Sequence, residues 1–149
     1  MGSVEIDGVL LSALGQIENP LGDVWHAMKS SDPGFESFGE AYFTHILPGK
    51  TKGWRKHLRM VQNLIVPSGL VLFGLVDERN ESPTLRHTQK MVVGYGHCAR
   101  LTIPPGVWVG FHGLSQKTAL ILNLASIEHD PGESINQPLE SIPFDWTEP

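Results

Sequence analysis

Short apolar runs separated by glycine and proline residues are the main pattern along the chain. The runs are rich in Val, Ile, Leu and Phe, and they have the length of β-strands rather than of helices. After residue 35, no segment has the long apolar period of an amphipathic helix. The pattern predicts strands over Glu40–Leu47, Val61–Val66, Leu70–Val76, Gln89–Val93, Arg100–Ile103, Val107–Leu114 and Thr118–Ala125.

These short strands, joined by Gly/Pro turns, predict an all-β sandwich or barrel. Only the segment from Val24 to Ser30 could form a short helix. The run Leu70–Val76 is apolar on both faces, so it should be a central, buried strand. In the polar loop that follows, Asp77 and Arg79 could be a functional pair, but a satisfied charge pair at a strand end is the commoner explanation.

The composition is that of an ordinary globular protein, 40% hydrophobic and 18% charged. The length fits one domain over residues 1–149. A formal charge of −5 argues against general nucleic-acid binding, which needs a basic surface. The single cysteine, Cys98, excludes an internal disulfide and suits a reducing compartment. Because no apolar run is long enough for a signal peptide or a membrane span, the expected location is the cytoplasm.

The stretch from Lys52 to Asn63 concentrates basic and titratable side chains ahead of an apolar strand. If this stretch is extended, Gly53, Arg55 and His57 share one face with Arg59 and Val61, because side chains alternate. An arginine and a histidine that point together into a pocket could hold an anion and move a proton. The alternative is a solvent-exposed basic edge, where lysine and arginine discourage pairing with other strands.

Five groups of residues occur in a recognisable order. They are Gly53 to His57; Gln62 to Val66 with Gly69; Val76 to Arg79 with Ser82-Pro83-Thr84; Leu101 to Phe111 with Leu114-Ser115; and Pro131 with Ile142 to Trp146. This series resembles the dTDP-4-dehydrorhamnose 3,5-epimerase family of sugar-nucleotide enzymes, over roughly residues 17 to 146. The resemblance implies a cupin jelly-roll barrel of two antiparallel sheets that generally works as a dimer.

The resemblance also implies a catalytic base. His57 occupies the place of the histidine that the family carries in an Arg-Gly-x-His segment. The arginine of that segment falls at Trp54, with Arg55 one position later. The chain departs from the family elsewhere too: Asn63 stands where the family has a lysine, Val109 where it has a second histidine, and Glu128 near its tyrosine acid. The family's aspartate partner of the base lies in a C-terminal tail that has no counterpart here.

Epimerisation beside a ketone requires one group to remove a proton and another to return a proton from the opposite face. A histidine titrates in a suitable range for the first role, which fits His57. Lys52, Arg55 or Asn63 could stabilise the developing enolate. The returning acid could be Glu128 or His129, although the stretch from Glu128 to Pro131 is more simply a polar turn leaving a strand. If neither residue serves, Tyr42 or His45 is the next candidate.

Further residues are expected around the site. His45 lies two residues after Phe43, so the two share one face of their strand. This face is predicted to be the inner one, which puts His45 beside His57 and leaves Tyr42 and Thr44 pointing the other way. The predicted cavity contains His57, Asn63 and Asn123. By the resemblance, Trp25 could stack on a nucleotide base across the dimer and His26 could bond to it; alternatively, Trp25 is simply a packing residue.

Metal binding is the natural alternative for a cupin with seven histidines. Metal-bearing cupins resemble one another in a close His-x-His pair followed by a glutamate, and in a third histidine after a Pro-x-Gly segment. In this chain no histidine lies two residues from His57, and Val109 occupies the third position. We therefore expect no metal and no other cofactor.

Two functions follow as hypotheses. The first is an isomerase that epimerises a nucleotide-linked 4-keto-6-deoxy sugar in surface-polysaccharide or deoxysugar biosynthesis, with His57 as the base. The second is a non-catalytic cupin that binds a sugar or sugar nucleotide. Geometry separates them, because the enzyme needs His57 beside an orienting carboxylate and facing a second acid. The expected partners are a nucleotide sugar and a second copy of the chain, rather than nucleic acid or a membrane.

Overall fold

The computed structural model describes residues 5–149. Nearly all of its regular structure is extended, as expected for short apolar runs between turns. The elements are β1 (Leu10–Ala13), β2 (Gly15–Ile17), β3 (Val24–His26), β4 (Glu40–Ile46), β5 (Thr51–His57), β6 (Gln62–Ser68), β7 (Leu70–Asp77), β8 (Thr88–Gly94), β9 (Ala99–Ile103), β10 (Val107–Gly113), β11 (Ala119–Ala125), β12 (Ser134–Asn136) and the short 3-10 helices η1 (Pro131–Glu133) and η2 (Leu139–Ser141).

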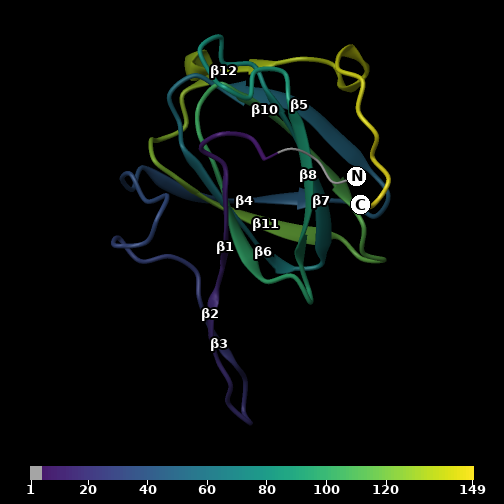
Figure 1. The fold of residues 1–149 in the computed structure, drawn as a ribbon. Helices are drawn as coiled ribbons and strands as arrows, with labels where there is room; N and C mark the ends of the chain where they lie inside the picture. The colour runs from purple at the N-terminus through teal and green to yellow at the C-terminus, as the bar shows by residue number, and fades with distance from the viewer. Residues whose placement is uncertain (1–4) are drawn as a thin grey trace.

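Two antiparallel five-stranded sheets pack face to face as a jelly-roll barrel (Figure 1). The first, here called the β4 sheet, has the strand order β1-β9-β6-β11-β4. The second, the β5 sheet, has the order β12-β5-β10-β7-β8. Strands β2 and β3 form a separate two-stranded ribbon that projects away from the barrel (Figure 1). The predicted all-β class and two-sheet barrel are confirmed.

All seven predicted strands are present, with ends within two residues of the expected ones. The predicted helix from Val24 to Ser30 is wrong: Val24–His26 is strand β3, which pairs with Gly15–Ile17. The apolar pattern did not predict this ribbon because most of its side chains are exposed, so it lacks the in-and-out alternation that a half-buried strand shows.

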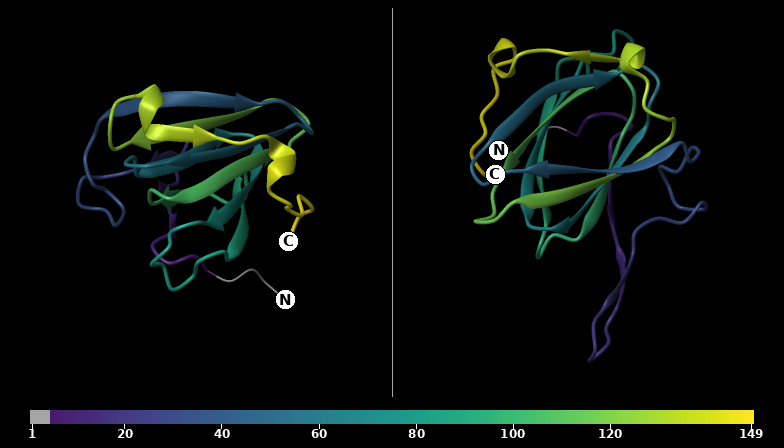
Figure 2. Two further views of the ribbon diagram at one scale, coloured as in Figure 1. Left: turned by 90° about the horizontal axis from the view of Figure 1, so that it is seen from above. Right: turned by 180° about the vertical axis from the view of Figure 1, so that it is seen from behind.

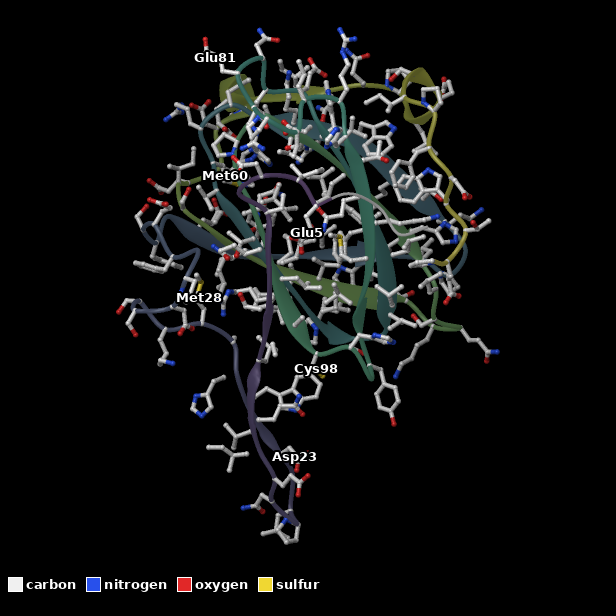
Figure 3. The ribbon with its side chains drawn as sticks, in the orientation of Figure 1. Glu5, Asp23, Met28, Met60, Glu81 and Cys98 are labelled. Atoms are coloured by element: carbon white, nitrogen blue, oxygen red, sulfur yellow. The ribbon has the colours of Figure 1, made fainter. Side chains whose placement is uncertain are left out.

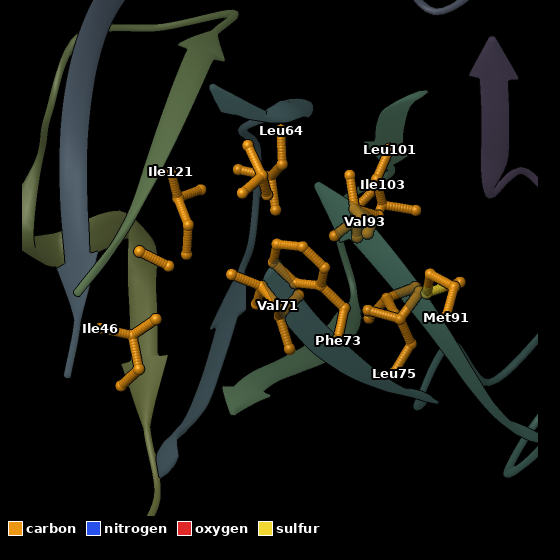
Figure 4. Packing of buried hydrophobic residues seen from close by; sticks show 14 of the residues in the cluster. Ile46, Leu64, Val71, Phe73, Leu75, Met91, Val93, Leu101, Ile103 and Ile121 are labelled. Carbon is orange, nitrogen blue, oxygen red and sulfur yellow. The ribbon is translucent and has the colours of Figure 1, made fainter. Parts of the chain in front are cut away.

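The core lies between the two sheets and takes alternate residues from each strand (Figure 4). On β7, for example, Val71, Phe73 and Leu75 enter the core, and Ile121 faces them from β11. The residues of β7 from Val71 to Leu75 are buried on both sides, as the apolar run predicted. The loop after β7 carries the expected ion pair: Asp77 Oδ1 accepts from Arg79 Nε at 2.9 Å.

The C-terminal segment after η2, residues 142–149, is here called the strap. It covers the outside of the β5 sheet and appears in yellow in Figure 2. Phe144 and Trp146 lie over Gly74, a glycine of β7; a Cβ atom there would stand 2.7 Å from the Phe144 ring. The ring of Trp54 on β5 completes an aromatic cluster, with its centroid 5.4 Å from that of each strap ring. The strap therefore explains why the outer face of β7 is buried as well.

No helix among residues 5–149 is both long and apolar enough to cross a membrane.

Candidate active site

One end of the barrel interior is not filled by core side chains and leaves a cavity of about 440 Å³. This volume lies in the range of small-molecule sites. Both sheets contribute walls, because the inward-facing positions of β4, β6 and β11 meet those of β5 and β10. The lining residues are Tyr42, Thr44, Lys52, Gly53, Trp54, Arg55, His57, Gln62, Leu64, Phe73, Val109, Phe111, Ile121, Asn123 and Asn136.

A β-bulge in strand β5 determines which basic residues reach the cavity. Val109 and Phe111 on β10 pair with Arg55 and Lys52, so β5 carries one extra residue over this interval. Strict alternation would place Lys52 on the face opposite to Arg55 and His57. With the bulge, all three line the cavity. Two cations and a histidine thus converge on one wall.

His57 pairs with a carboxylate that the sequence did not single out. Its side chain is buried, and its Nδ1 atom is hydrogen-bonded to Oε1 of Glu133. Glu133 is the last residue of η1, and the strand that follows, β12, pairs with β5 so that Ser134 lies opposite His57. The resemblance implies an aspartate partner of the base that has no counterpart in this chain; in the structure a glutamate from the turn before β12 stands beside His57 instead.

Three backbone amides hold the other oxygen of Glu133. Oε2 accepts hydrogen bonds from the N–H groups of Leu58, Arg59 and Met60, at 3.2, 3.0 and 3.1 Å. Burial alone would raise the pKa of Glu133, but the hydrogen bonds from His57 and from these amides outweigh burial, and the pKa lies below its usual value. Glu133 is thus an ionised acceptor, so the shared proton lies on Nδ1 of His57, and in the neutral imidazole the lone pair is then on Nε2.

The Nε2 atom of His57 is buried and has no hydrogen-bond partner among residues 5–149. A buried polar atom without a partner costs about 1–3 kcal/mol, so such atoms are rare and call for a functional explanation. Because His57 lines the cavity, a bound ligand is the natural partner. The arrangement can act as a general base: an oriented imidazole with a free nitrogen, backed by a carboxylate.

The opposite wall presents a hydroxyl and an amide. Tyr42 comes from β4 and Asn123 from β11, and these two residues are directly opposite each other in the β4 sheet. Asn123 Nδ2 donates to the Tyr42 hydroxyl at 2.9 Å. The two sheets form facing walls of the cavity, with His57 on the β5 sheet and Tyr42 on the β4 sheet.

The register of β4 reverses the predicted orientation of its side chains. Tyr42 and Thr44 point inward and line the cavity, whereas His45 is exposed on the outer face. The expectation that His45 would lie beside His57 is therefore wrong; its backbone oxygen instead accepts from Lys52 Nζ at 2.6 Å. The polar–apolar alternation of β4 is ambiguous, and a one-residue change of register exchanges the two faces.

Asn63 also lies outside the predicted cavity. On β6 the neighbouring Gln62 and Leu64 point inward, so Asn63 faces outward. Its Nδ2 donates to the Gly34 carbonyl at 3.0 Å, and its Oδ1 accepts from Thr102 at 2.6 Å. Asn63 thus holds the loop before β4 against the outside of the barrel. Of the predicted cavity residues, His57 and Asn123 are in place and Asn63 is not.

The structure does not bring the other predicted residues to the cavity. Glu128 and His129 are exposed after β11 and are not among the lining residues. Trp25 and His26 lie on the projecting β2–β3 ribbon, and Asp23 lies near its tip (Figure 3). Arg59 does not continue the face of Arg55 and His57, because β5 ends at His57; instead it pairs at the surface with Asp130, at 3.0 Å.

Sequence reasoning missed Glu133, Gln62 and Asn136, and it named Tyr42 only as a later candidate for the acid, with the wrong orientation. Tyr42 and Gln62 needed the strand registers, which only pairing defines. For Glu133 a partial signal existed, since Asp130-Pro131-Gly132 is a turn directly after the last long strand. Asp130 caps this turn, accepting from Gly132 N at 3.0 Å. Asn136 accepts from Arg55 Nε at 2.9 Å and so helps to orient that cation.

Within residues 5–149, no three His, Cys, Asp or Glu side chains come together as a possible metal site.

A jelly-roll barrel with an oriented histidine–carboxylate pair in its cavity defines a cupin equipped for proton transfer. No family model matches the chain. The chain is 38% identical to a dTDP sugar isomerase from Desulfovibrio desulfuricans G20, over 95% of this chain and 92% of that one, with a TM-score of 0.89. The chain therefore belongs to the dTDP-4-dehydrorhamnose 3,5-epimerase family of sugar-nucleotide isomerases, which confirms the family predicted from the sequence.

Two further comparisons agree. Over 109 residues the chain is 28% identical to the probable low-salt glycan biosynthesis epimerase Agl13 of Haloferax volcanii; the match covers 70% of this chain and 66% of that protein, just under two thirds. The fold is also similar to that of dTDP-4-dehydrorhamnose 3,5-epimerase from Elizabethkingia anophelis NUHP1, with a TM-score of 0.83 at 16% identity over 98% of this chain and 85% of that one.

Proposed function

We propose that this protein epimerises a nucleotide-linked 4-keto-6-deoxy sugar, in deoxysugar or polysaccharide biosynthesis, with His57 as the general base. The observation that carries the proposal is the buried His57–Glu133 pair, whose free Nε2 belongs to a residue lining the cavity. A binding module needs a cavity but has no use for a buried, unpartnered imidazole nitrogen. The related dTDP sugar isomerase and glycan biosynthesis epimerase support the same reaction class.

The chemistry begins with Nε2 taking a proton from the carbon beside the ketone. The C–H electron pair moves into an enolate, and the negative charge collects on the ketone oxygen. Glu133 stabilises the imidazolium that forms, as a carboxylate does behind other catalytic histidines. A proton delivered to the same carbon from the opposite face then gives the inverted centre, and His57 releases its proton to water.

Lys52 and Arg55 are proposed to bind the anionic part of the substrate. Both are solvent-exposed at the cavity wall, where a cation can meet a diphosphate without the cost of full burial. Arg55 is oriented by Asn136, and Lys52 lies 5.9 Å from the centroid of the Phe111 ring. Asn123 is the remaining predicted substrate-binding residue that reaches the cavity.

A homodimer in the cytoplasm is also proposed. The outer face of the β4 sheet supports the dimer, because Phe43 is 60% exposed there beside the half-buried Leu122 of β11. Exposed apolar residues on the projecting ribbon, including Leu21 and Trp25, add further uncovered area. In such a dimer, Trp25 and His26 would contact the nucleotide of the partner's site. The single cysteine supports a reducing compartment.

His57→Asn tests the proposal. This substitution keeps the shape of the side chain and removes the base. We expect wild-type protein in heavy water to exchange deuterium into a dTDP-4-keto-6-deoxy sugar next to the ketone, as followed by NMR or mass spectrometry. The variant should lose about 10²- to 10⁴-fold of this rate, while its affinity for the sugar nucleotide stays within several-fold.

His97→Asn is the matched control, because His97 is exposed in the turn between β8 and β9, away from the cavity, and should exchange like the wild type. Wild-type protein that binds the sugar nucleotide but exchanges no deuterium between weakly acidic and weakly basic pH would instead identify a binding module.

A further inference from the structure

We infer that Asn123 fixes the Tyr42 hydroxyl with its proton directed into the cavity, which makes Tyr42 the acid that returns the proton opposite His57. The inference rests on the proposed epimerase function and assigns its second catalytic group. It concerns a tyrosine on strand β4, not a residue after β11 where sequence comparison places the acid.

The neighbours of Asn123 allow only one orientation of its amide. Asn123 Oδ1 accepts from the backbone N–H of Asn63 at 3.2 Å, and a backbone N–H can only donate. On the other side, Asn123 Nδ2 lies 3.7 Å from the sulfur of Met60, which can only accept. Rotating the amide by a half-turn would set nitrogen against N–H and oxygen against sulfur. The nitrogen must therefore face Tyr42.

The Tyr42 oxygen is consequently an acceptor toward Asn123, at 2.9 Å. Its own proton has to point elsewhere, and within residues 5–149 the hydroxyl makes no other hydrogen bond. Because Tyr42 lines the cavity, the open direction is toward a bound ligand. The amide thus converts a group that could either donate or accept into a donor toward the cavity.

The buried surroundings keep this arrangement fixed. Asn123 is 2% exposed, and its amide is satisfied on every side, so it has no reason to rotate. Tyr42 is supplied by the β4 sheet and His57 by the β5 sheet, so a sugar held between them would meet the two groups on opposite faces. Inversion needs this geometry. When the enolate carbon takes the Tyr42 proton, the O–H electrons stay on the phenolate oxygen, which the Asn123 N–H stabilises until water reprotonates it.

Tyr42→Phe separates the two half-reactions. Without the acid, His57 can still remove a proton and return a deuteron to the same face, so exchange with retention should continue. Inversion should fall, lowering the ratio of inverted product to exchanged substrate by about 10²- to 10⁴-fold. Both quantities are measured on one sample by NMR in heavy water. The other tyrosine of the chain, Tyr95, is 85% exposed in a turn, and Tyr95→Phe should leave the ratio unchanged.

Asn123→Asp tests the positioning role. One carboxylate oxygen can still accept from the Asn63 amide, but the other now accepts from Tyr42 and draws the hydroxyl proton out of the cavity. The inversion-to-exchange ratio should fall in the same direction as in Tyr42→Phe. A general loss of structure would lower both rates together and leave their ratio unchanged. Asn123→Ala adds no acceptor and should lower the ratio less than Asn123→Asp does. Because it introduces no buried charge, it also controls for misfolding caused by the aspartate.

The outcomes are distinguishable. If wild-type protein shows no exchange at all, the proposed function fails. If wild-type protein exchanges and inverts but Tyr42→Phe keeps the wild-type ratio, the epimerase function stands and Tyr42 is not the acid. If Tyr42→Phe lowers the ratio while both Asn123 variants retain it, Tyr42 is the acid and Asn123 does not position it.

Discussion

Glu133 is placed by contacts that its own residue type does not predict. A glutamate buried this deeply is normally unfavourable, and three amides with one imidazole are needed to make the ionised form stable. The amides of Leu58, Arg59 and Met60 are available because β5 ends at His57 and the chain turns there. The His57–Glu133 pair is thus assembled from a strand end and a 3-10 turn that lie 76 residues apart in sequence.

We predict that Glu133→Gln removes most of the activity while the fold survives. The glutamine oxygen can accept from the three amides, which leaves its NH₂ group facing Nδ1 of His57. Nδ1 then accepts and the proton moves to Nε2, so the histidine adopts the tautomer that cannot act as a base. The rate of deuterium exchange should fall about 10²- to 10⁴-fold.

Glu128→Gln is the matched control, since Glu128 is exposed and outside the cavity, and its exchange rate should be that of the wild type. Equal losses in the two variants, measured with both proteins folded by circular dichroism, would contradict the assigned pair.

Among the elements, strand β5 and the C-terminal strap depend on each other. Trp54 precedes Arg55 on β5, so its ring lies on the outer face. There its backbone N–H donates to Gln137 O at 2.8 Å and its indole donates to Leu139 O at 3.0 Å. Phe144 and Trp146 then pack on the Trp54 ring and over Gly74 and Gly110, where no side chain stands in the way. The strap thus secures the strand that carries Lys52, Arg55 and His57.

We predict that Gly74→Ala destabilises the protein by about 1–3 kcal/mol through this packing. A Cβ atom at residue 74 would lie 2.7 Å from two atoms of the Phe144 ring and 2.8 Å from Trp146, so the strap must shift. Urea denaturation followed by tryptophan fluorescence measures the loss, because Trp54 and Trp146 report on the strap.

Gly15→Ala provides the comparison, since its nearest atom would be 3.6 Å away on the ribbon and its effect should stay within about 0.5 kcal/mol. Equal midpoints for the two variants would show that the strap does not pack as described.

At the scale of the whole molecule, the outer faces of the two sheets differ in how far other segments of the chain cover them. The strap covers the outside of the β5 sheet, and the loop held by Asn63 and Arg100 covers part of the β4 sheet. The remainder of the β4 sheet, around Phe43 and Leu122, is left uncovered and apolar. An apolar sheet face beside an edge strand is a common site of association between subunits.

We predict that the protein is a dimer at micromolar concentration and that Phe43→Lys produces a monomer, as measured by light scattering. A lysine there would place a charge in the contact, where its desolvation opposes association. Tyr95→Lys replaces another exposed aromatic residue, in a turn, and should leave the dimer intact. A monomeric wild type, or a Phe43→Lys protein that remains dimeric, would contradict this interface.

The sequence by itself determined the strands of the barrel and the family, and it singled out His57 as the proposed base. Apolar runs such as Leu70–Val76 are local signals, because a strand buried on both faces must be apolar throughout. His57 could be found because its neighbours in sequence resemble a known segment. Asn123 was expected in the cavity from the strand count and the family resemblance, and it lines the cavity.

Only the tertiary structure decided which polar residues face the base. The faces of β4 and β6 depend on pairing register, so Tyr42 and Gln62 point inward while His45 and Asn63 do not. The bulge in β5, which adds Lys52 to the cavity wall, appears only when β10 is paired with it. The partner of His57 required β12 to return beside β5, since contacts between distant segments are set by packing rather than by local sequence.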